Sequence, residues 1–251
     1  MLWTGTAAAV SDSFKELLLE LAQQRSLEEL LPQITRRLAE HEDVALARLW
    51  LVEPGDQCAA CPNAGACPDR SRCLHLVASA GRGRDGTAVV HRRLDGDFRR
   101  IPIGAFKVGL VAATQTPVVV TDPAHDAKIR RPQWVQAEGI QGFAGLPLRC
   151  RDELLGVLGV FVRAPITPAA IDVLQILANH AAAAIATARA FAREEALRRQ
   201  LALENQLLRR QAEGDEGLVG HSPRPAWDAA RAGCRGAHRC HGAGAGGVGH
   251  G

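Results

Sequence analysis

The pattern of apolar residues predicts helices in the first forty or so positions. Between residues 13 and 25, and again after Ser26, apolar side chains recur at steps of three and four residues. Each run predicts an amphipathic helix that buries one face. Ser26 is a suitable N-cap for the second helix, because Glu28 and Glu29 follow in its first turn.

Short runs rich in β-branched and apolar residues follow and predict strands. They cover residues 44–52, 74–80, 117–121, 143–148 and 154–161. The run 117–121 has the pattern of a largely buried strand, and the last two runs are joined by a turn at residues 151–152. A helix is predicted at 105–114 and one helical turn at 133–137. Hairpins between helices at both ends predict an α+β fold, an antiparallel sheet flanked by helices.

A helical pattern without Gly or Pro then runs over residues 169–213. If all of it is helical, it spans about 70 Å. Apolar residues repeat along it at steps of three and four, and this length and regularity predict a parallel two-stranded coiled coil. We therefore expect a homodimer through the 169–213 helix. The seam residues are Leu174, Leu177, Ala181, Ala184, Ala188, Phe191, Leu197, Leu201 and Leu208.

Charge and composition exclude several classes of protein. The net charge of +3 comes from the last 28 residues, where four arginines stand against Asp228 alone, so residues 1–223 are neutral. This balance gives no support for direct binding of nucleic acid or of a membrane. The first ten residues lack the basic region of a signal peptide, and no apolar run reaches the length of a bilayer span. We therefore expect a cytoplasmic protein with reduced or metal-bound cysteines.

Four of the seven cysteines form the strongest chemical motif. Cys58, Cys61, Cys67 and Cys73 lie within sixteen residues, in a segment interrupted by proline and glycine. Thiolates at such spacing can bind a tetrahedral zinc ion or an iron–sulfur cluster. Redox-sensing thiols and thiols without a function are the alternatives. His75 follows two residues after the last cysteine and is a fifth candidate ligand or a solvated strand residue.

The polar connection 121–138 is a second candidate site. Long ordered connections in compact domains often carry function. This one gathers polar and aromatic side chains that could bind a small molecule, above all His125, Asp126, Arg130 and Trp134. The alternative is a solvated loop in which Trp134 packs down as an anchor.

Three segments in the second half of the domain resemble a known family. Residues 139–148 (GIQGFAGLPL), 153–161 (ELLGVLGVF) and 174–190 are similar to the closing half of GAF sensory domains. The resemblance implies a GAF domain at 11–190 and a small-molecule pocket beneath the 121–138 connection. It also implies a coiled-coil signalling helix at 191–213.

Residues 217–223 (GLVGHSP) resemble the entry of the AAA+ ATPase of sigma-54-dependent transcription activators. The whole chain is thus similar to the sensory part of such an activator, with residues 214–223 as the start of the ATPase domain. The signal would be a small molecule or a redox change, and the partner in an intact relative would be the AAA+ domain. The phosphate-loop lysine and the DNA-binding helices of that family are absent from this sequence.

The tail 224–251 consists almost entirely of Gly, Ala, Arg, His and Cys, which predicts disorder. Read one base further on, the degenerate codons of residues 237–251 can spell a buried strand followed by Gly-Glu-Ser-Gly-Thr-Gly, the beginning of a phosphate-binding loop. We therefore interpret the tail as frameshifted. The glycines of the tail itself predict no ATP binding, because neither a lysine nor a helix follows them.

No catalytic arrangement is evident, and we expect a regulatory protein and not an enzyme. One enzymatic alternative stays open, because some GAF domains reduce methionine sulfoxide with cysteines. Here the Cys58–Cys73 cluster and Cys150 could supply the nucleophile and the resolving thiol. A stand-alone metal- or redox-binding GAF protein is a further alternative.

Overall fold

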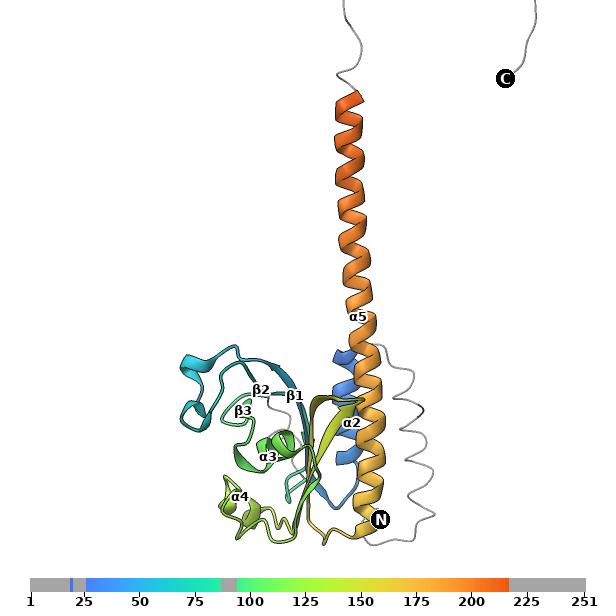
Figure 1. The fold of residues 1–251 in the computed structure, drawn as a ribbon. Coiled ribbons are helices and arrows are strands. Elements are labelled where there is room, and N and C mark those ends of the chain that lie inside the picture. Colours follow the sequence, from blue (N-terminus) through green and yellow to red (C-terminus); the bar gives the residue numbers. More distant parts are fainter. Residues whose placement is uncertain (1–18, 20–25, 87–93, 217–251) are drawn as a thin grey trace, which may run out of the picture. The chain divides into compact units, whose positions relative to one another are not determined.

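A computed structural model describes residue 19 and residues 26–86 and 94–216 (Figure 1). The helix expected at 13–25, the ATPase entry at 217–223 and the tail therefore lie outside the described residues, apart from Leu19. The elements are α2 (Leu27–Ala39), β1 (Val44–Pro54), two short 3-10 helices (Cys58–Ala60 and Ala64–Ala66), β2 (Arg72–Gly81), β3 (Arg100–Pro102), α3 (Phe106–Thr114), β4 (Val118–Val120), α4 (Pro132–Ala137), β5 (Gly142–Cys150), β6 (Glu153–Val162) and α5 (Pro168–Glu216).

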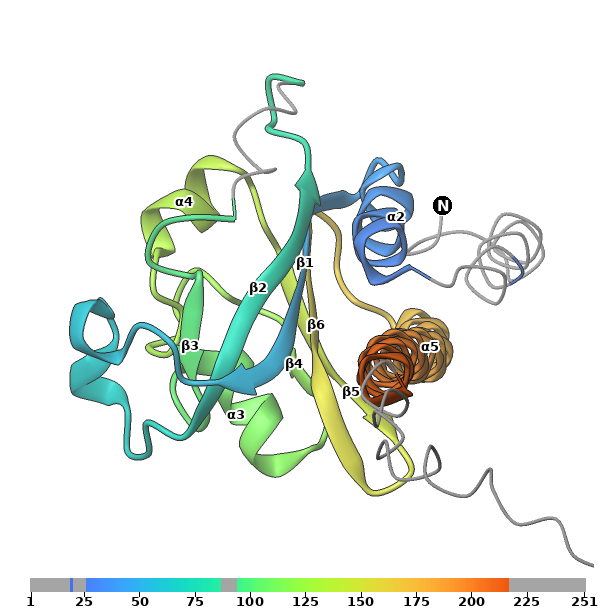
Figure 2. The same ribbon diagram turned by 90° about the horizontal axis from the view of Figure 1, so that it is seen from above.

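The six strands form one sheet in the order β3-β2-β1-β6-β5-β4, and every neighbouring pair is antiparallel. This confirms the predicted α+β fold with an antiparallel sheet. Helices α2 and α5 cover one face of the sheet, and α3 and α4 lie on the other (Figure 2). The central strands β1 and β6 are therefore buried on both faces.

The short strand β4 lies at one edge of the sheet and differs from its prediction. It pairs only with β5, and of its three residues only Val120 is buried, while Val119 is 36% exposed. The expectation of a largely buried strand at 117–121 is therefore wrong. A β-branched run looks the same in a sequence whether the strand is central or at an edge.

The two helices on the first face enclose the larger core. Helix α2 buries Leu30, Leu31, Ile34 and Leu38, as its periodicity predicts. Ser26 is the N-cap residue with an extended backbone, but its side chain makes no capping hydrogen bond. The buried apolar side chains of α2 pack with those of α5 and of the inner face of the sheet.

Helix α5 confirms the predicted long helix, but the first half of this helix packs in the core of its own domain. Five of the expected seam residues are buried in the core of their own domain, namely Leu174, Leu177, Ala181, Ala184 and Ala188. They are not available to a second chain, so the expectation of a dimer seam along this part of the helix is wrong. The large apolar residues further along α5 are exposed, beginning with Phe191 and continuing with Leu197, Leu201, Leu203, Leu207 and Leu208.

Helix α5 also corrects the expectation that no segment could span a bilayer. Among the described residues, Pro168–Gln211 is the one helix that is long and apolar enough by length and composition, with a mean hydropathy of 1.4 in its most apolar window. The alanines of that window raise its hydropathy. Because 44% of the window is buried inside the domain, packing on the sheet accounts for the apolar character of this part of α5.

Candidate functional site

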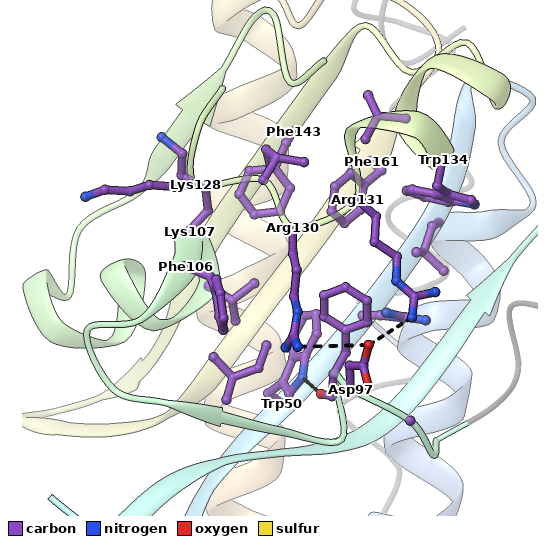
Figure 3. Close-up of a pocket in the computed structure, with 18 of the residues that line it drawn as sticks. Trp50, Asp97, Phe106, Lys107, Lys128, Arg130, Arg131, Trp134, Phe143 and Phe161 are labelled. Carbon is purple, nitrogen blue, oxygen red and sulfur yellow. Dashed lines mark hydrogen bonds and ion pairs between the residues drawn. The ribbon is translucent and has the colours of Figure 1, made fainter. Parts of the chain in front are cut away.

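A cavity of about 370 Å³ opens on the face of the sheet that carries α3 and α4 (Figure 3). Strands β1, β5 and β6 supply aromatic side chains from the sheet. The segment before β3, the start of α3 and the segment leading into α4 complete the wall. The lining side chains include Arg48, Trp50, Asp95, Asp97, Phe98, Phe106, Lys107, Lys128, Arg130, Arg131, Trp134, Phe143 and Phe161.

The aromatic part of the lining is held by close contacts. The rings of Phe143 and Phe161 lie 4.8 Å apart, and Trp134 meets Phe161 edge to face at 5.6 Å. The Trp50 indole donates a hydrogen bond from Nε1 to the Phe98 carbonyl oxygen at 2.9 Å. Gly159 lies against these rings, because a Cβ atom there would be 3.1 Å from Trp50 Cζ3. The absent side chain leaves room for the indole.

The lining carries five basic side chains against two acidic ones. Most of the basic groups have partners among the described residues. Lys107 Nζ lies 2.6 Å from the Asp126 carboxylate, and Arg131 Nη2 lies 3.0 Å from the Asp97 carboxylate. Arg130 Nη2 is 4.0 Å from the same Asp97 oxygen. These pairs neutralise part of the positive charge around the cavity.

Arg48 differs from the other basic residues of the lining. Its Nε donates to Ser79 Oγ at 3.2 Å, and its guanidinium carbon lies 5.3 Å from the centre of the Phe98 ring. The structure pairs it with no carboxylate among the described residues. Burial, together with the nearby positive charge of Arg131, lowers the pKa of Arg48 to about 10. It remains a cation at neutral pH in an aromatic environment.

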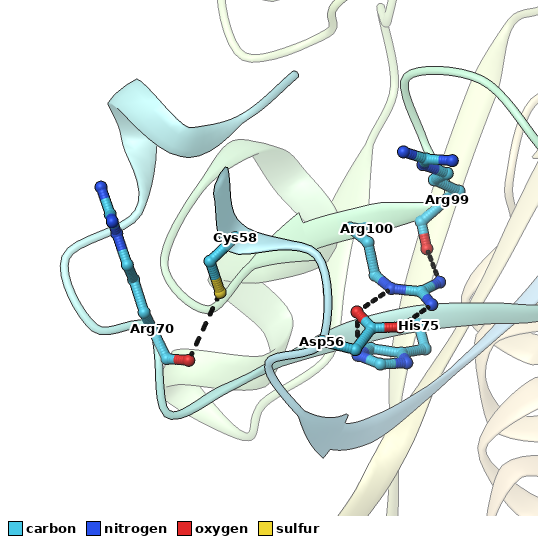
Figure 4. Close-up of polar contacts among 6 residues, drawn as sticks. All are labelled: Asp56, Cys58, Arg70, His75, Arg99 and Arg100. Carbon is cyan, nitrogen blue, oxygen red and sulfur yellow. Dashed lines mark hydrogen bonds and ion pairs between the residues drawn. The ribbon is translucent and has the colours of Figure 1, made fainter. Parts of the chain in front are cut away.

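The four clustered cysteines line a second, much smaller cavity of about 20 Å³. They are partly buried. Cys58 Sγ donates to the Arg70 carbonyl at 3.6 Å (Figure 4), and Cys67 Sγ donates to the Asp69 carbonyl at 3.1 Å. No three His, Cys, Asp or Glu side chains of the described residues stand in a ligating arrangement. The thiols thus share one space without converging on a point.

A bidentate ion pair borders the cysteine cavity (Figure 4). Arg100 donates from Nε and Nη2 to the two Asp56 carboxylate oxygens, at 2.8 and 2.5 Å. His75 Nε2 is buried without a hydrogen-bond partner, and lies 3.7 Å from an Asp56 oxygen. His75 does not line the cavity. Burial raises the pKa of Cys73 to about 11, so that thiol is neutral at pH 7.

Asn63 connects the cysteine segment to the larger cavity. It lies between Cys61 and Cys67 and is only 4% exposed. Its Nδ2 donates to the carbonyl oxygens of Asp97 and Arg100, at 2.8 and 2.6 Å. Its Oδ1 accepts a hydrogen bond from Arg130 Nη1. One buried amide therefore contacts two residues that line the larger cavity.

The sequence of residues 26–185 matches the GAF domain family. The match covers more than half of the chain and includes both cavities and the whole sheet. This chain belongs to the GAF family. A search of curated proteins found no significant match.

Solved GAF-fold structures resemble the domain in fold. The GAF domain of a phosphoenolpyruvate-protein phosphotransferase from Coxiella burnetii has a TM-score of 0.54 at 21% identity, covering 75% of this chain and 99% of that one. Free methionine-R-sulfoxide reductase from Neisseria meningitidis has 0.53 at 15%, covering 74% and 95%. The A. aeolicus Nlh2 GAF domain has 0.50 at 13%, covering 69% and 93%. At these identities the likeness shows the fold alone.

Only two of the four ligand candidates of the 121–138 connection line the larger cavity. Arg130 and Trp134 line the larger cavity. Asp126 contacts Lys107 of the lining, and it also accepts a hydrogen bond from the Lys128 backbone N–H at 2.9 Å. The His125 side chain is 78% exposed and pairs with Asp122 outside the cavity. Trp134 also packs edge to face against Phe161, a contact that both the ligand-site interpretation and the alternative of an anchoring tryptophan allow.

Several lining residues were not among the sequence candidates. Trp50, Phe98, Phe106 and Lys107 come from segments without a recognisable motif. Arg48 did carry a signal, since it is the one cation within the otherwise apolar run 44–52. A charged side chain in a strand buried on both faces needs a compensating environment. A lone arginine in a buried strand thus predicts a polar or charged site next to β1.

The Asp56–Arg100 pair predicts a pH dependence of stability. The Arg100 hydrogen bonds hold the pKa of Asp56 well below its ordinary value. Because the folded-state pKa is depressed, the pair stabilises the domain above the unfolded-state pKa of about 3.9, and that contribution is lost as the pH falls further. We expect Asp56→Asn to lower the melting temperature at pH 7 and to flatten its decline between pH 5 and 3. Thermal unfolding followed by circular dichroism tests this.

The matched control is Asp152→Asn, at the exposed turn between β5 and β6. It removes the same charge without removing an ion pair that the structure shows. Equal pH profiles for the two variants would show that the Asp56–Arg100 pair contributes nothing to acid sensitivity.

Proposed function

We propose that this GAF domain is a sensory module that binds a small organic anion with an apolar or aromatic body in the larger cavity. The observation that carries the proposal is Arg48, a cation in the lining that has no carboxylate partner among the described residues. A desolvated cation without a counter-charge is costly, and an anionic ligand would provide that charge.

The size and lining of the cavity support the same class of ligand. Its volume of about 370 Å³ falls in the range of small-molecule sites. Six aromatic rings line it, and together they offer surface for a flat or apolar ligand body. The basic side chains exceed the acidic ones, which favours a negative ligand group.

We further propose that the domain serves a sigma-54-dependent transcription activator and is regulatory and not catalytic. The support is the segment 217–223, which resembles the entry of an AAA+ domain, together with the helix α5 that leads up to it. The nucleotide sequence of the gene tests this assignment. A shifted frame after Pro223 that encodes Gly-Glu-Ser-Gly-Thr-Gly supports it, and a shifted frame without that string contradicts it.

The cysteine geometry argues against Cys150 as the resolving thiol of a sulfoxide reductase. Strands β1 and β6 lie between β2 and β5, so Cys150 is about 14 Å from β2 at a strand spacing of about 4.8 Å. A disulfide needs Cα atoms within about 7 Å, so Cys150 cannot resolve a bond to Cys73 without a large movement. The neutral Cys73 thiol is also a poor nucleophile.

The test compares anionic ligands with neutral analogues of the same shape. Purified protein is screened by thermal shift against aromatic carboxylates, each paired with its amide. We expect carboxylates to stabilise the domain and amides to do so much less. Arg48→Gln should weaken the binding of a stabilising carboxylate by about 10- to 100-fold, the range for a hydrogen bond to a charged group.

Arg36→Gln is the control, because it removes a positive charge from the exposed side of α2, away from the cavity. It should leave affinity unchanged. Equal affinities of wild type and Arg48→Gln, or equal binding of amides and carboxylates, would contradict the proposal.

A further inference from the structure

The cysteine segment of the GAF domain is outside the cavity to which the ligand-binding function is assigned. We propose that Cys58, Cys61, Cys67 and Cys73 bind one zinc ion, and that this ion fixes the segment whose Asn63 holds Arg130 at the larger cavity. The first part of the proposal is independent of the proposed ligand, and the second part rests on it.

The shared cavity supports a site with four thiolate ligands. Cys58 begins the first 3-10 helix, Cys61 and Cys67 directly follow the first and second 3-10 helices, and Cys73 lies at the start of β2. All four line the same small space. The four partly buried thiols line one cavity but do not stand in a ligating arrangement, so a metal ion would have to draw them together. Four cysteines are the ligand set of structural zinc sites, in which the metal is tetrahedral and has no open position.

The spacing of the cysteines favours a single ion over an iron–sulfur cluster. The CxxC-x5-C-x5-C pattern differs from the spacings of bacterial and plant-type ferredoxins. Structural zinc sites with four cysteines need no sulfide and tolerate a wider range of spacings.

Metal binding would require a change of side-chain rotamers, because the thiols do not stand in a ligating arrangement. The thiols of Cys58 and Cys67 donate weak hydrogen bonds to carbonyl oxygens of the same segment. Rotation about χ1 to another staggered position would break these bonds and redirect the sulfur atoms. The zinc ion would form four Zn–S bonds, and the four thiols would release four protons to water.

Two arginines next to the site offset part of its charge. A zinc ion with four thiolates has a net charge of −2, and Arg70, Arg100 and Asp56 line the cysteine cavity, which leaves one net positive charge around it. Asp56 holds Arg100 in a fixed bidentate orientation. Such supporting groups are a regular part of metal sites, because they stabilise and orient the ligands.

Asn63 would link the position of the cysteine segment to the position of Arg130 at the larger cavity. It lies between the second and third cysteine, and its amide contacts Arg130 and the Asp97 backbone. Both residues line the cavity. A metal-bound segment would hold Asn63 in place, and with it the Arg130 guanidinium. Loss of the metal would release this contact and lower the affinity for an anion.

The first experiment measures metal stoichiometry in the full chain. Protein purified under reducing conditions and supplied with zinc chloride should contain about one zinc per chain by mass spectrometry. Substitution with cobalt should give the strong thiolate-to-cobalt absorption of a tetrahedral four-sulfur site. Cys61→Ser and Cys67→Ser should lose both signals, and circular dichroism shows whether these variants keep the fold.

The double variant Cys234→Ser/Cys240→Ser and the single variant Cys150→Ser are the controls, since they remove the other three cysteines of the chain. Both should keep one zinc. Iron with acid-labile sulfide, the absence of bound zinc, or loss of zinc in these controls would overturn the proposal.

The second experiment tests the coupling with 8-anilinonaphthalene-1-sulfonate, a fluorescent aromatic anion, as the probe. Removing zinc with a chelator should weaken its binding about fivefold or more in wild type. Asn63→Ala should keep zinc but bind the probe weakly with or without the chelator. Unchanged affinity after zinc removal would refute the coupling and leave the zinc site intact. The variant Arg48→Gln tests the anion site separately. Loss of probe binding in this variant supports the proposed ligand site, whatever the effect of zinc.

Discussion

Gly156→Ala is expected to lower the free energy of unfolding by about 3 kcal/mol, and the melting temperature by about 6–12 °C. Gly156 lies on β6 opposite Leu51 of β1, in the centre of the sheet. A Cβ atom at this position would be 2.1 Å from the Trp50 carbonyl oxygen and 3.1 Å from Leu51 Cα. Both are backbone atoms, so no side chain can rotate away, and the two central strands would have to separate.

Gly65→Ala is the matched control, because nothing lies within 4 Å of a Cβ atom at Gly65. It should change stability by less than about 1 kcal/mol. Chemical denaturation of both variants gives the comparison. A loss below 1 kcal/mol for Gly156→Ala would mean that β1 and β6 separate at little cost. The side chain of Trp50, which lines the cavity, would then be held less rigidly than its packing indicates.

The sequence predicted best those elements whose partners are close in the chain. Strands β5 and β6 are joined by a tight turn, and their apolar runs and the turn at Arg151 could be recognised locally. Helix α5 was equally clear, because its pattern continues without a break. The position of β1 between β2 and β6 was not predictable in this way. It depends on pairing across more than a hundred residues, which no local pattern encodes.

The candidate site was predicted only in part for a similar reason. The 121–138 connection was identified, but its backbone orients successive side chains in different directions. Asp126 accepts the Ile129 N–H through its carbonyl oxygen, and this turn leaves His125 in solvent while Arg130 reaches the cavity. Arg48 enters the same cavity from β1. The sheet brings these two arginines together, although 82 positions separate them in the sequence.

The alanine-rich half of α5 shows how one pattern can have two explanations. Alanines and leucines at steps of three and four fit a second helix or a sheet equally well. In the structure they face the sheet of their own domain, with Ala181 and Ile185 fully buried. Small side chains allow the helix to approach the strands closely. Only the leucines beyond Phe191 keep the interpretation of a dimer seam open.

The remaining exposed leucines predict self-association through the far half of α5. Leu197, Leu201 and Leu208 lie on one side of the helix and are 56%, 52% and 64% exposed. Ion pairs such as Arg198 with Glu194 lie along the same part of the helix and favour helix formation. An exposed leucine row on a long helix is typical of a coiled-coil seam. We therefore expect a parallel dimer that uses residues beyond 191.

Leu201→Glu is expected to raise the dissociation constant of this dimer by about 100-fold, equivalent to about 2.7 kcal/mol, because it places two carboxylates in an apolar seam. Gln206→Glu is the control. It adds the same charge five residues further on, nearly on the opposite side of the helix at 3.6 residues per turn. Sedimentation equilibrium over a range of concentrations measures both variants. A wild-type protein that is monomeric at micromolar concentration would contradict the prediction, and so would equal weakening by both substitutions. In either case the exposed leucines of α5 would need a different partner.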